Sequence, residues 1–196
     1  MEPFIPRYYK CPKCDFVALN ASYRLDKEAE KSHYNHHENS AENLGYVQMF
    51  EHFLTFVDTH VIYEKVLEFG CGPGPVLANM LENFGKRVVC YDPYFFPNEG
   101  YSSQKYDLIT TTEVFEHLAN SLEVLTHLQT LLRPGGSIAI MTHFHYNDAP
   151  SFDSWWYRRD PTHIGFFTPK TFEVLAKQLS LHVKACDGKK YILLSS

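Results

Sequence analysis

The segment Val66-Leu-Glu-Phe-Gly-Cys-Gly-Pro-Gly74 decides the fold of this chain. An apolar strand runs into a loop with glycines at 70, 72 and 74, and a helix-compatible stretch follows from Pro75. Such a loop lets a nucleotide-type cofactor lie against the backbone without meeting a Cβ atom. A dinucleotide-binding site has the motif Gly-x-Gly-x-x-Gly, and in this chain Pro75 occupies the position of the last glycine. The spacing therefore favours a cofactor without a pyrophosphate.

The residues around this loop form a candidate cofactor site. Glu68 ends the strand with a carboxylate that suits a cation such as an aminoacyl ammonium. A second strand-like run, 87–91, ends at Asp92, 22 residues after Gly70, where Rossmann-like units place an acid that binds ribose hydroxyls. These features indicate S-adenosylmethionine. The candidate cofactor residues are Glu68, Gly70, Cys71, Gly72, Gly74, Asp92, Pro93, Thr112 and Glu113.

Further strand-like segments follow the second strand along the chain. Residues 106–111 form a third strand, and 131–141 end a helix, turn on Pro134-Gly135-Gly136 and start a fourth strand. Together these motifs resemble the class I S-adenosylmethionine-dependent methyltransferases over about residues 60 to 185. The resemblance implies an α/β, Rossmann-like, doubly wound and mostly parallel sheet.

The connections of the sheet are also predicted. Only 14 residues, 93–106, separate Asp92 from Asp107, too few for a strand and a helix, so one βα unit is shortened or absent. Thr168-Pro169 starts a helix that ends near Leu179. The Asp187-Gly188 turn then joins the strands 181–186 and 189–194 in a C-terminal antiparallel hairpin.

Two parts of the chain differ in composition. Residues 1–43 are polar and contain Cys and His, and we expect a small N-terminal extension or a cap over the cofactor site. Residues 44–58 carry apolar side chains at helical spacing. We therefore assign 44–196 to the methyltransferase domain.

A second constellation, Glu113-Val-Phe-Glu116-His117, follows the third strand. If this segment is helical, its three ligand-type side chains share one face, and His163 lies in the loop before the last helix. The pattern resembles the metal-dependent branch of the family, which includes the ubiquinone-pathway O-methyltransferases and the small-RNA 3′-terminal 2′-O-methyltransferases. The resemblance implies that Glu113, Glu116, His117 and His163 hold a divalent ion.

An ion would lower the pKa of an acceptor hydroxyl and fix its position. Two carboxylates suit Mg²⁺, whereas two imidazoles shift the preference towards Mn²⁺, Fe²⁺ or Zn²⁺. The metal-free alternative has Glu116 orienting His117 or capping a helix, and His163 acting as a general base or satisfied within its loop. In either case the candidate catalytic residues are Glu116, His117 and His163.

The N-terminal segment contains a candidate structural zinc site. Cys11-Pro-Lys-Cys14 is half of a zinc knuckle, and His33-x₃-His37 is an acceptable second pair, although 18 residues separate Cys14 from His33. Alternatively the second pair is missing and the histidines lie on a solvated helix. In a third interpretation the segment 34–39 resembles the N-terminal segments of uncharacterised bacterial relatives and folds over the cofactor.

Aromatic residues make up 15% of the chain, with a dense cluster at 155–157. Tyr94, Phe95 and Phe96 are candidates for the wall beside the adenine or the acceptor. Arg158 and Arg159 are candidates for binding an anionic acceptor, with solvated arginines as the alternative.

Composition narrows the function. With 196 residues, 44% of them hydrophobic, the chain can bury one core, and its net charge of -5 argues against broad binding of nucleic acid. No membrane span or signal peptide is evident, and five cysteines suggest reduced thiols, so we expect a cytoplasmic protein. The leading hypothesis is O-methylation of a small molecule. A nucleic-acid methyltransferase and a non-catalytic cofactor-binding or interaction module are the alternatives.

Overall fold

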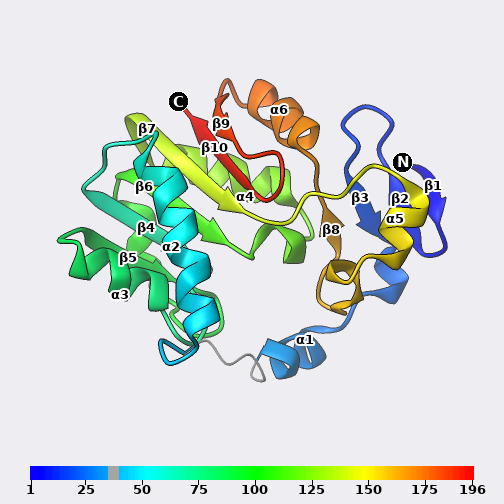
Figure 1. The fold of residues 1–196 in the computed structure, drawn as a ribbon, viewed down its shortest axis with the longest axis horizontal. Coiled ribbons are helices and arrows are strands. Elements are labelled where there is room, and N and C mark those ends of the chain that lie inside the picture. Colours follow the sequence, from blue (N-terminus) through cyan, green and yellow to red (C-terminus); the bar gives the residue numbers. More distant parts are fainter. Residues whose placement is uncertain (35–39) are drawn as a thin grey trace.

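The computed structural model describes residues 1–34 and 40–196, which form two sheets surrounded by helices (Figure 1). The larger sheet has six strands in the order β5-β4-β6-β7-β10-β9. Its strands are β4 (Lys65–Phe69), β5 (Arg87–Tyr91), β6 (Tyr106–Thr112), β7 (Leu132–Met141), β9 (His182–Cys186) and β10 (Tyr191–Ser195). The first four are parallel, and β10 runs antiparallel to β7 and β9. The predicted Rossmann-like sheet with a C-terminal antiparallel hairpin is confirmed.

Helices cover both faces of this sheet, because its strands present alternate apolar side chains to each side. In β7, Ile138 and Ile140 join one core cluster, and Ala139 and Met141 join the other. The first cluster includes side chains of α4 and α6, and the second includes side chains of α2 and α3. These helices are α2 (Leu44–Asp58), α3 (Val76–Asn83), α4 (Ser121–Thr130) and α6 (Pro169–Gln178).

The chain between β5 and β6 contains a short 3-10 helix, Glu99–Ser103, in place of a strand and a full helix. β5 is therefore an edge strand of the sheet, and the prediction that one βα unit is shortened or absent is confirmed.

The predicted start of α6 and the predicted turn between β9 and β10 are confirmed. Thr168 caps α6 in a capping box with Thr171, and three consecutive backbone amides, those of residues 189–191, donate to Asp187 Oδ1 in the β9-β10 turn. One local prediction is wrong. The Pro134-Gly135-Gly136 turn lies inside β7 as an irregularity in its pairing with β6, because the chain already pairs at Leu132.

The smaller sheet is antiparallel, in the order β1-β2-β3-β8. It comprises β1 (Glu2–Ile5), β2 (Tyr8–Lys10), β3 (Val17–Leu19) and β8 (Gly165–Phe166). Together with α5 (Ala149–Ser154) it encloses a separate core that includes Tyr8, Phe152 and Tyr157. The N-terminal segment is thus paired with the loop region that follows His163. The domain boundary at residue 43 stays a prediction.

The helix α1 (Lys27–Tyr34) lies between the two sheets at the lower edge of Figure 1. Among the described helices, none is long and apolar enough to cross a membrane.

Candidate active site

A cavity of about 570 Å³ lies at the carboxyl ends of the parallel strands, within the size range of small-molecule sites. Open α/β sheets bind ligands at this edge because the loops that follow neighbouring strands meet there. The cavity is lined mainly by the loops after β4, β5, β6 and β7, by residues of α1 and α2, and by residues between 156 and 163.

Two glycines in the loop after β4 have a backbone conformation that other residues rarely adopt. Gly70 and Gly72 have φ angles of 80° and 64°, in the left-handed region that favours glycine. A Cβ atom on Gly70 would lie 2.4 Å from Val114 Cγ2. Gly70, Cys71 and Gly72 all line the cavity, whereas Gly74 does not. The first half of the loop is therefore the part that a ligand can approach.

Asp92 lies at the end of β5 and is buried. Its Oδ2 accepts a hydrogen bond from the Gly72 amide at 3.1 Å, and its Oδ1 accepts from the amides of Tyr94 and Phe95 at 2.8 and 3.1 Å. Asp92 and Pro93 line the cavity, and so do Tyr94 and Phe95, but Phe96 does not. The carboxylate thus joins two cavity loops and holds a fixed position beside the glycines.

Glu68 lies beneath the loop and does not line the cavity. It is 2% exposed, and the Cys90 Sγ lies 3.9 Å from its Oε2. Burial raises the pKa of Glu68 well above its usual range, although a hydrogen bond from the Ala78 amide opposes the shift. In this structure the Glu68 side chain therefore contacts Cys90 and the start of α3, and its expected contact with an ammonium group of the cofactor stays a prediction.

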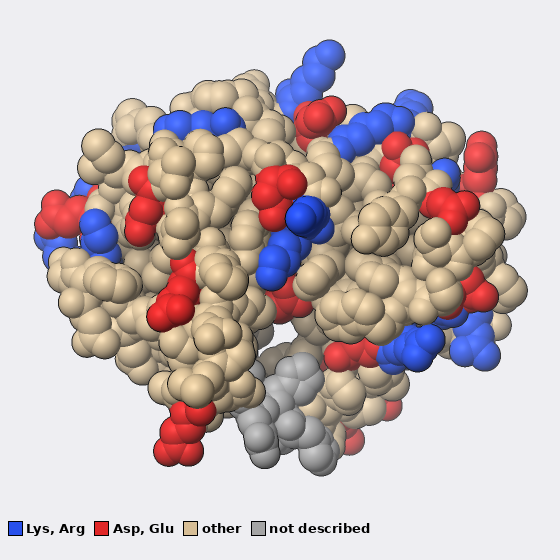
Figure 2. All heavy atoms as spheres, viewed as in Figure 1, with Lys and Arg blue, Asp and Glu red and all other residues tan. Residues whose placement is uncertain are grey.

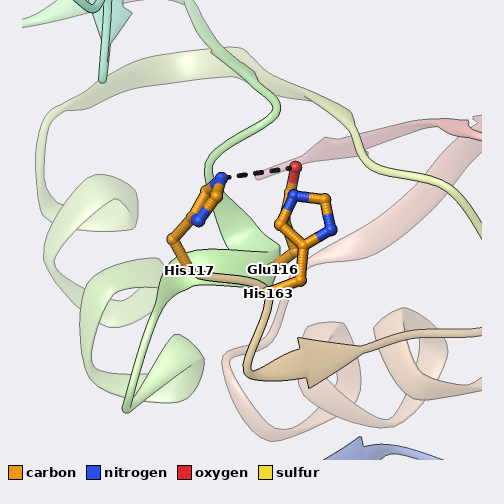
Figure 3. A group of neighbouring side chains, drawn as sticks. All are labelled: Glu116, His117 and His163. Atoms are coloured by element: carbon orange, nitrogen blue, oxygen red, sulfur yellow. Dashed lines mark ion pairs between the residues drawn. The ribbon is translucent and has the colours of Figure 1, made fainter. Parts of the chain in front are cut away.

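Three of the predicted catalytic and metal-ligating side chains come together beside this loop (Figure 3). Glu116 and His117 lie on a 3-10 turn, Phe115–His117, and His163 comes from the loop before β8. One potential ligand atom from each of the three side chains lies within 4.8 Å of the others. Glu116 Oε1 and His117 Nε2 are 3.9 Å apart.

Backbone carbonyl groups set the tautomers of both histidines. His117 Nδ1 lies 3.1 Å from the Thr162 oxygen, and His163 Nδ1 lies 2.7 Å from the Tyr157 oxygen. A carbonyl oxygen only accepts, so each Nδ1 carries a proton and donates it. Each neutral ring therefore keeps a lone pair on Nε2. Burial lowers the pKa of His163, which favours this neutral form.

Tyr157 links two carboxyl groups. Its hydroxyl oxygen lies 2.6 Å from Glu116 Oε1 and 2.9 Å from Glu113 Oε2. A hydroxyl has one proton to donate, so one carboxyl must donate in return when no cation is present. Burial and the charge of Glu116 raise the pKa of Glu113 well above its usual range. Among the described residues, Glu113 Oε1 and Glu116 Oε2 are buried without a hydrogen-bond partner.

The predicted helical face is wrong. Glu113 precedes the 3-10 turn with a φ angle of 54°, so it does not stack above Glu116 and His117. The group with metal-ligand spacing does not contain it. Glu113 instead meets Glu116 through the Tyr157 hydroxyl, while its own side chain still lines the cavity with Thr112.

Several lining residues were not among the predicted site residues. His143, Trp156 and Tyr157 line the cavity, as do Glu30 and Tyr34 of α1. His143 lies two positions after the last residue of β7. Ligands bind beyond the carboxyl ends of parallel strands, so this position could have been predicted to line the site. Trp156 and Tyr157 belong to the aromatic cluster at 155–157, and Tyr34 begins the segment 34–39, so among these five residues only Glu30 carried no signal in the sequence.

The four-residue zinc site is not assembled by the described residues. Cys11 and Cys14 lie in the β2-β3 turn, whereas His33 Nε2 lies 3.3 Å from Asp160 Oδ1. The part of the chain that the structure describes brings no histidine and cysteine pair into a metal-ligand group. His37 lies outside the described residues.

The two arginines proposed for an anionic acceptor do not line the cavity. Arg158 forms an ion pair with Asp153 at 2.5 Å and lies over the ring of Tyr8. Arg159 Nη2 donates to the Ser154 oxygen. That expectation is corrected, because both guanidinium groups bind to the segment that carries α5.

Comparison with known proteins adds the family. A family model described as a methyltransferase domain matches residues 10–184. No curated protein gives a significant match.

Solved structures are similar at low identity. The mitomycin 7-O-methyltransferase superposes with a TM-score of 0.59 at 11% identity, covering 85% of this chain and 60% of its own. A putative sarcosine dimethylglycine methyltransferase from Galdieria sulphuraria gives 0.57 at 14%, covering 88% and 92%. The plantazolicin methyltransferase, solved with S-adenosylhomocysteine and a monoazolic desmethyl analogue of plantazolicin, gives 0.56 at 15%, covering 87% and 90%. The chain thus spans less than two thirds of the first of these proteins.

Proposed function

The chain belongs to the methyltransferase-domain family, and we propose that it is an S-adenosylmethionine-dependent methyltransferase that methylates a hydroxyl oxygen of a small-molecule acceptor. The observation that carries this proposal is that the glycine loop, Asp92 and the residues Glu113, His117 and His163 line one cavity. Similar structures are named for the small-molecule acceptors mitomycin and plantazolicin, which supports an acceptor of this size.

For the methyl donor, we assign the ribose hydroxyls to Asp92 and the close backbone approach to Gly70, Cys71 and Gly72. Pro93, Thr112 and Glu113 complete the cofactor side of the cavity. The donor supplies an electrophilic methyl group on a sulfonium, and the protein residues orient it and exclude water.

We infer that Glu116, His117 and His163 hold a divalent ion. Their fit rests on two unprotonated Nε2 atoms and on Glu116 Oε2, a buried oxygen without a partner among the described residues. Two imidazoles and one carboxylate favour Zn²⁺, Fe²⁺ or Mn²⁺ over Mg²⁺. The ion, when bound, lowers the pKa of an acceptor hydroxyl.

The residues also account for the acceptor's proton. Without an ion, the lone pair on His163 Nε2 is free to accept it. With an ion, whose charge would offset that of Glu116, the Glu113 carboxylate would be the group that accepts it. In both cases the acceptor oxygen attacks the methyl carbon, in line with the bond between sulfur and that carbon, which breaks.

We further propose that α1 caps the cavity. Glu30 and Tyr34 line it, and the Glu30 carboxylate accepts hydrogen bonds from the hydroxyls of Tyr34 and Tyr94. His33 contacts Asp160 at the same side of the molecule. Because α1 touches both the loop after β5 and the region near His163, its position controls access to the site.

Calorimetric titration of the metal-stripped protein with S-adenosylhomocysteine, repeated with Mg²⁺, Mn²⁺ and Zn²⁺ in turn, tests the proposal. Binding near micromolar, about -8 kcal/mol, supports it. No binding under any condition contradicts it. Glu116→Gln should abolish the heat from the ion and the turnover but keep the affinity for S-adenosylhomocysteine. The matched control is Glu51→Gln, at an exposed position of α2.

A further inference from the structure

The chemical class of the acceptor can be read from the cavity wall, provided that the proposed methyl transfer to oxygen holds. One wall consists of successive rings whose neighbouring centroids lie 4.2 to 5.3 Å apart. In order, these rings belong to Trp156, His143, Tyr157, His163, His117 and Tyr34. We call this set the ring wall. All of its members line the cavity.

Trp156, at one end of the ring wall, is 62% exposed although it lines the cavity. Within the described residues its ring contacts are with His143 and Tyr157. A large apolar side chain that is open to solvent at a cavity marks a place where a ligand can replace water. Trp156 therefore offers a flat apolar surface to a ligand.

His143, the next member, is uncharged near neutral pH. Burial, aided by the charge of Lys190, lowers the pKa of His143 to about 4. Its ring nitrogens and the Trp156 indole N–H have no hydrogen-bond partner among the described side chains and backbone groups. The ring wall thus combines flat surfaces with neutral polar atoms that can bind a ring substituent.

The charges of the cavity exclude other acceptor classes. Among the described residues, the lining contains the carboxyl groups of Glu30, Asp92, Glu113 and Asp160 but no lysine or arginine. Apart from the proposed ion and the charge of Lys190, which acts on the lining residues His143 and Glu113, an anionic acceptor would meet carboxyl groups and no lysine or arginine in this lining. In Figure 2 a gap opens between the two halves of the molecule, with acidic side chains at its border and basic side chains next to them above it.

Apart from the carboxylate assigned to the ribose of the methyl donor, Asp92, the polar groups of the lining lie beside aromatic rings. The described lining contains no asparagine, glutamine or serine, the side chains that supply directional hydrogen bonds to many hydroxyls. Aromatic side chains bind planar ligands with little loss of conformational entropy, because they have few rotatable bonds.

We propose that the acceptor is a planar aromatic ring that carries the reacting hydroxyl and no anionic group, bound against Trp156 and His143. In the reaction the bond between sulfur and the methyl carbon breaks and a bond between the phenolic oxygen and that carbon forms. The products are an aryl methyl ether, S-adenosylhomocysteine and the phenolic proton.

The test compares ring compounds with matched analogues on the metal-loaded protein. Phenols and catechols with varied neutral substituents are assayed beside the saturated cyclohexane diol and a catechol that bears a carboxylate. Methylation of the neutral aromatic compounds, at least tenfold above both analogues in kcat/KM, is expected. Equal use of the saturated or the carboxylated analogue would overturn the proposal.

Variants of Trp156 locate the binding surface. Trp156→Ala should raise the KM for the aromatic acceptor at least tenfold with little change in kcat, and Trp156→Phe should restore most of the loss. Affinity for S-adenosylhomocysteine should stay the same in both. The control is Phe84→Ala, at a position 68% exposed and outside the cavity lining. An unchanged KM in Trp156→Ala would overturn the assignment.

The two proposals fail separately. If S-adenosylhomocysteine and the ion bind but none of the aromatic compounds is methylated, the aromatic acceptor is wrong and the proposed methyltransferase site stands. If S-adenosylhomocysteine does not bind, the proposed function itself is wrong.

Discussion

The carboxylate of Asp92 accepts a hydrogen bond of 3.1 Å from the backbone amide of Gly72, so the ends of two neighbouring strands share one polar contact inside the cavity. Asp92→Ala removes this acceptor as well as the assigned ribose ligand. We expect the affinity for S-adenosylhomocysteine to fall about 10- to 100-fold, since hydrogen bonds to a charged group contribute roughly 1.5–3 kcal/mol. Calorimetry measures the change.

Asp107→Asn is the control for that experiment. Asp107 pairs with Arg133 at 2.7 Å and begins β6 at the end remote from the cavity. This variant should lose some stability and keep its affinity for S-adenosylhomocysteine. Unchanged affinity in Asp92→Ala would remove Asp92 from the cofactor site.

Gly70→Ala should impair both folding and cofactor binding. The left-handed conformation costs a non-glycine residue roughly 1–2 kcal/mol, and the new Cβ would also lie 2.4 Å from Val114 Cγ2. Gly85→Ala is the control, because Gly85 has a similar φ angle, 78°, but nothing lies within 4 Å of a Cβ atom added there. Thermal unfolding should show the larger loss for Gly70→Ala, and only this variant should bind S-adenosylhomocysteine more weakly. Equal losses in both would show that the Val114 contact is unimportant.

Tyr157→Phe should weaken the proposed ion site selectively. The variant keeps the Tyr157 carbonyl that orients His163, but it loses the hydroxyl between Glu113 and Glu116. Groups that orient metal ligands typically contribute about 10- to 100-fold in metal affinity, so titration with Zn²⁺ or Mn²⁺ should show a loss of that size. Tyr146→Phe, at a residue 79% exposed, is the control. Retained ion affinity in Tyr157→Phe would argue against the site.

Tyr94→Phe tests the capping role of α1. The substitution removes the hydrogen bond of 3.0 Å from the Tyr94 hydroxyl to Glu30 and keeps the ring. Because Tyr94 is partly exposed, we expect only a few-fold faster dissociation of S-adenosylhomocysteine, measured by stopped-flow competition. Tyr9→Phe, on the remote strand β2, should leave the rate unchanged. Identical rates for Tyr94→Phe and the wild type would contradict a cap held by this contact.

The stability of the fold should fall below pH 6.5 because of His145. Its Nδ1 accepts from the Asn147 amide and its Nε2 donates to the Asp15 oxygen, so the buried ring is neutral. Burial lowers the pKa of His145 to about 4, and the unfolded chain takes up the proton first, near pH 6.5. The stability that depends on the neutral ring is present above pH 6.5 and is lost as the pH falls towards 4.

The expected loss from this residue between pH 7 and pH 5 is about 2 kcal/mol. Urea unfolding at the two pH values measures it. His145→Gln should be less stable at pH 7 but should lose less stability on acidification than the wild type. His60→Gln, at an exposed position, should behave as the wild type does. An equal loss in His145→Gln would assign the pH dependence to other groups.

Local signals in the sequence were enough to predict the sheet. The glycines at 70 and 72 need a left-handed backbone, Asp92 follows a strand at a set spacing, and Thr168-Pro169 begins a helix whatever surrounds it. Each of these depends on the conformation of a few consecutive residues. Together with the resemblance to the methyltransferases, these signals predicted a mostly parallel sheet, the shortened or absent unit after Asp92 and the C-terminal hairpin.

Only the tertiary structure decided which side chains meet. Glu116 and Tyr157 are 41 positions apart in the chain, and their contact exists because the pairing of β3 with β8 anchors the segment that carries His163 beside the 3-10 turn. Glu68 is buried by a different set of contacts, because β4 lies between β5 and β6 and the Ala78 amide of α3 approaches its carboxyl group. Sequence spacing determines conformation over short distances, whereas contacts between distant segments depend on how the whole core packs.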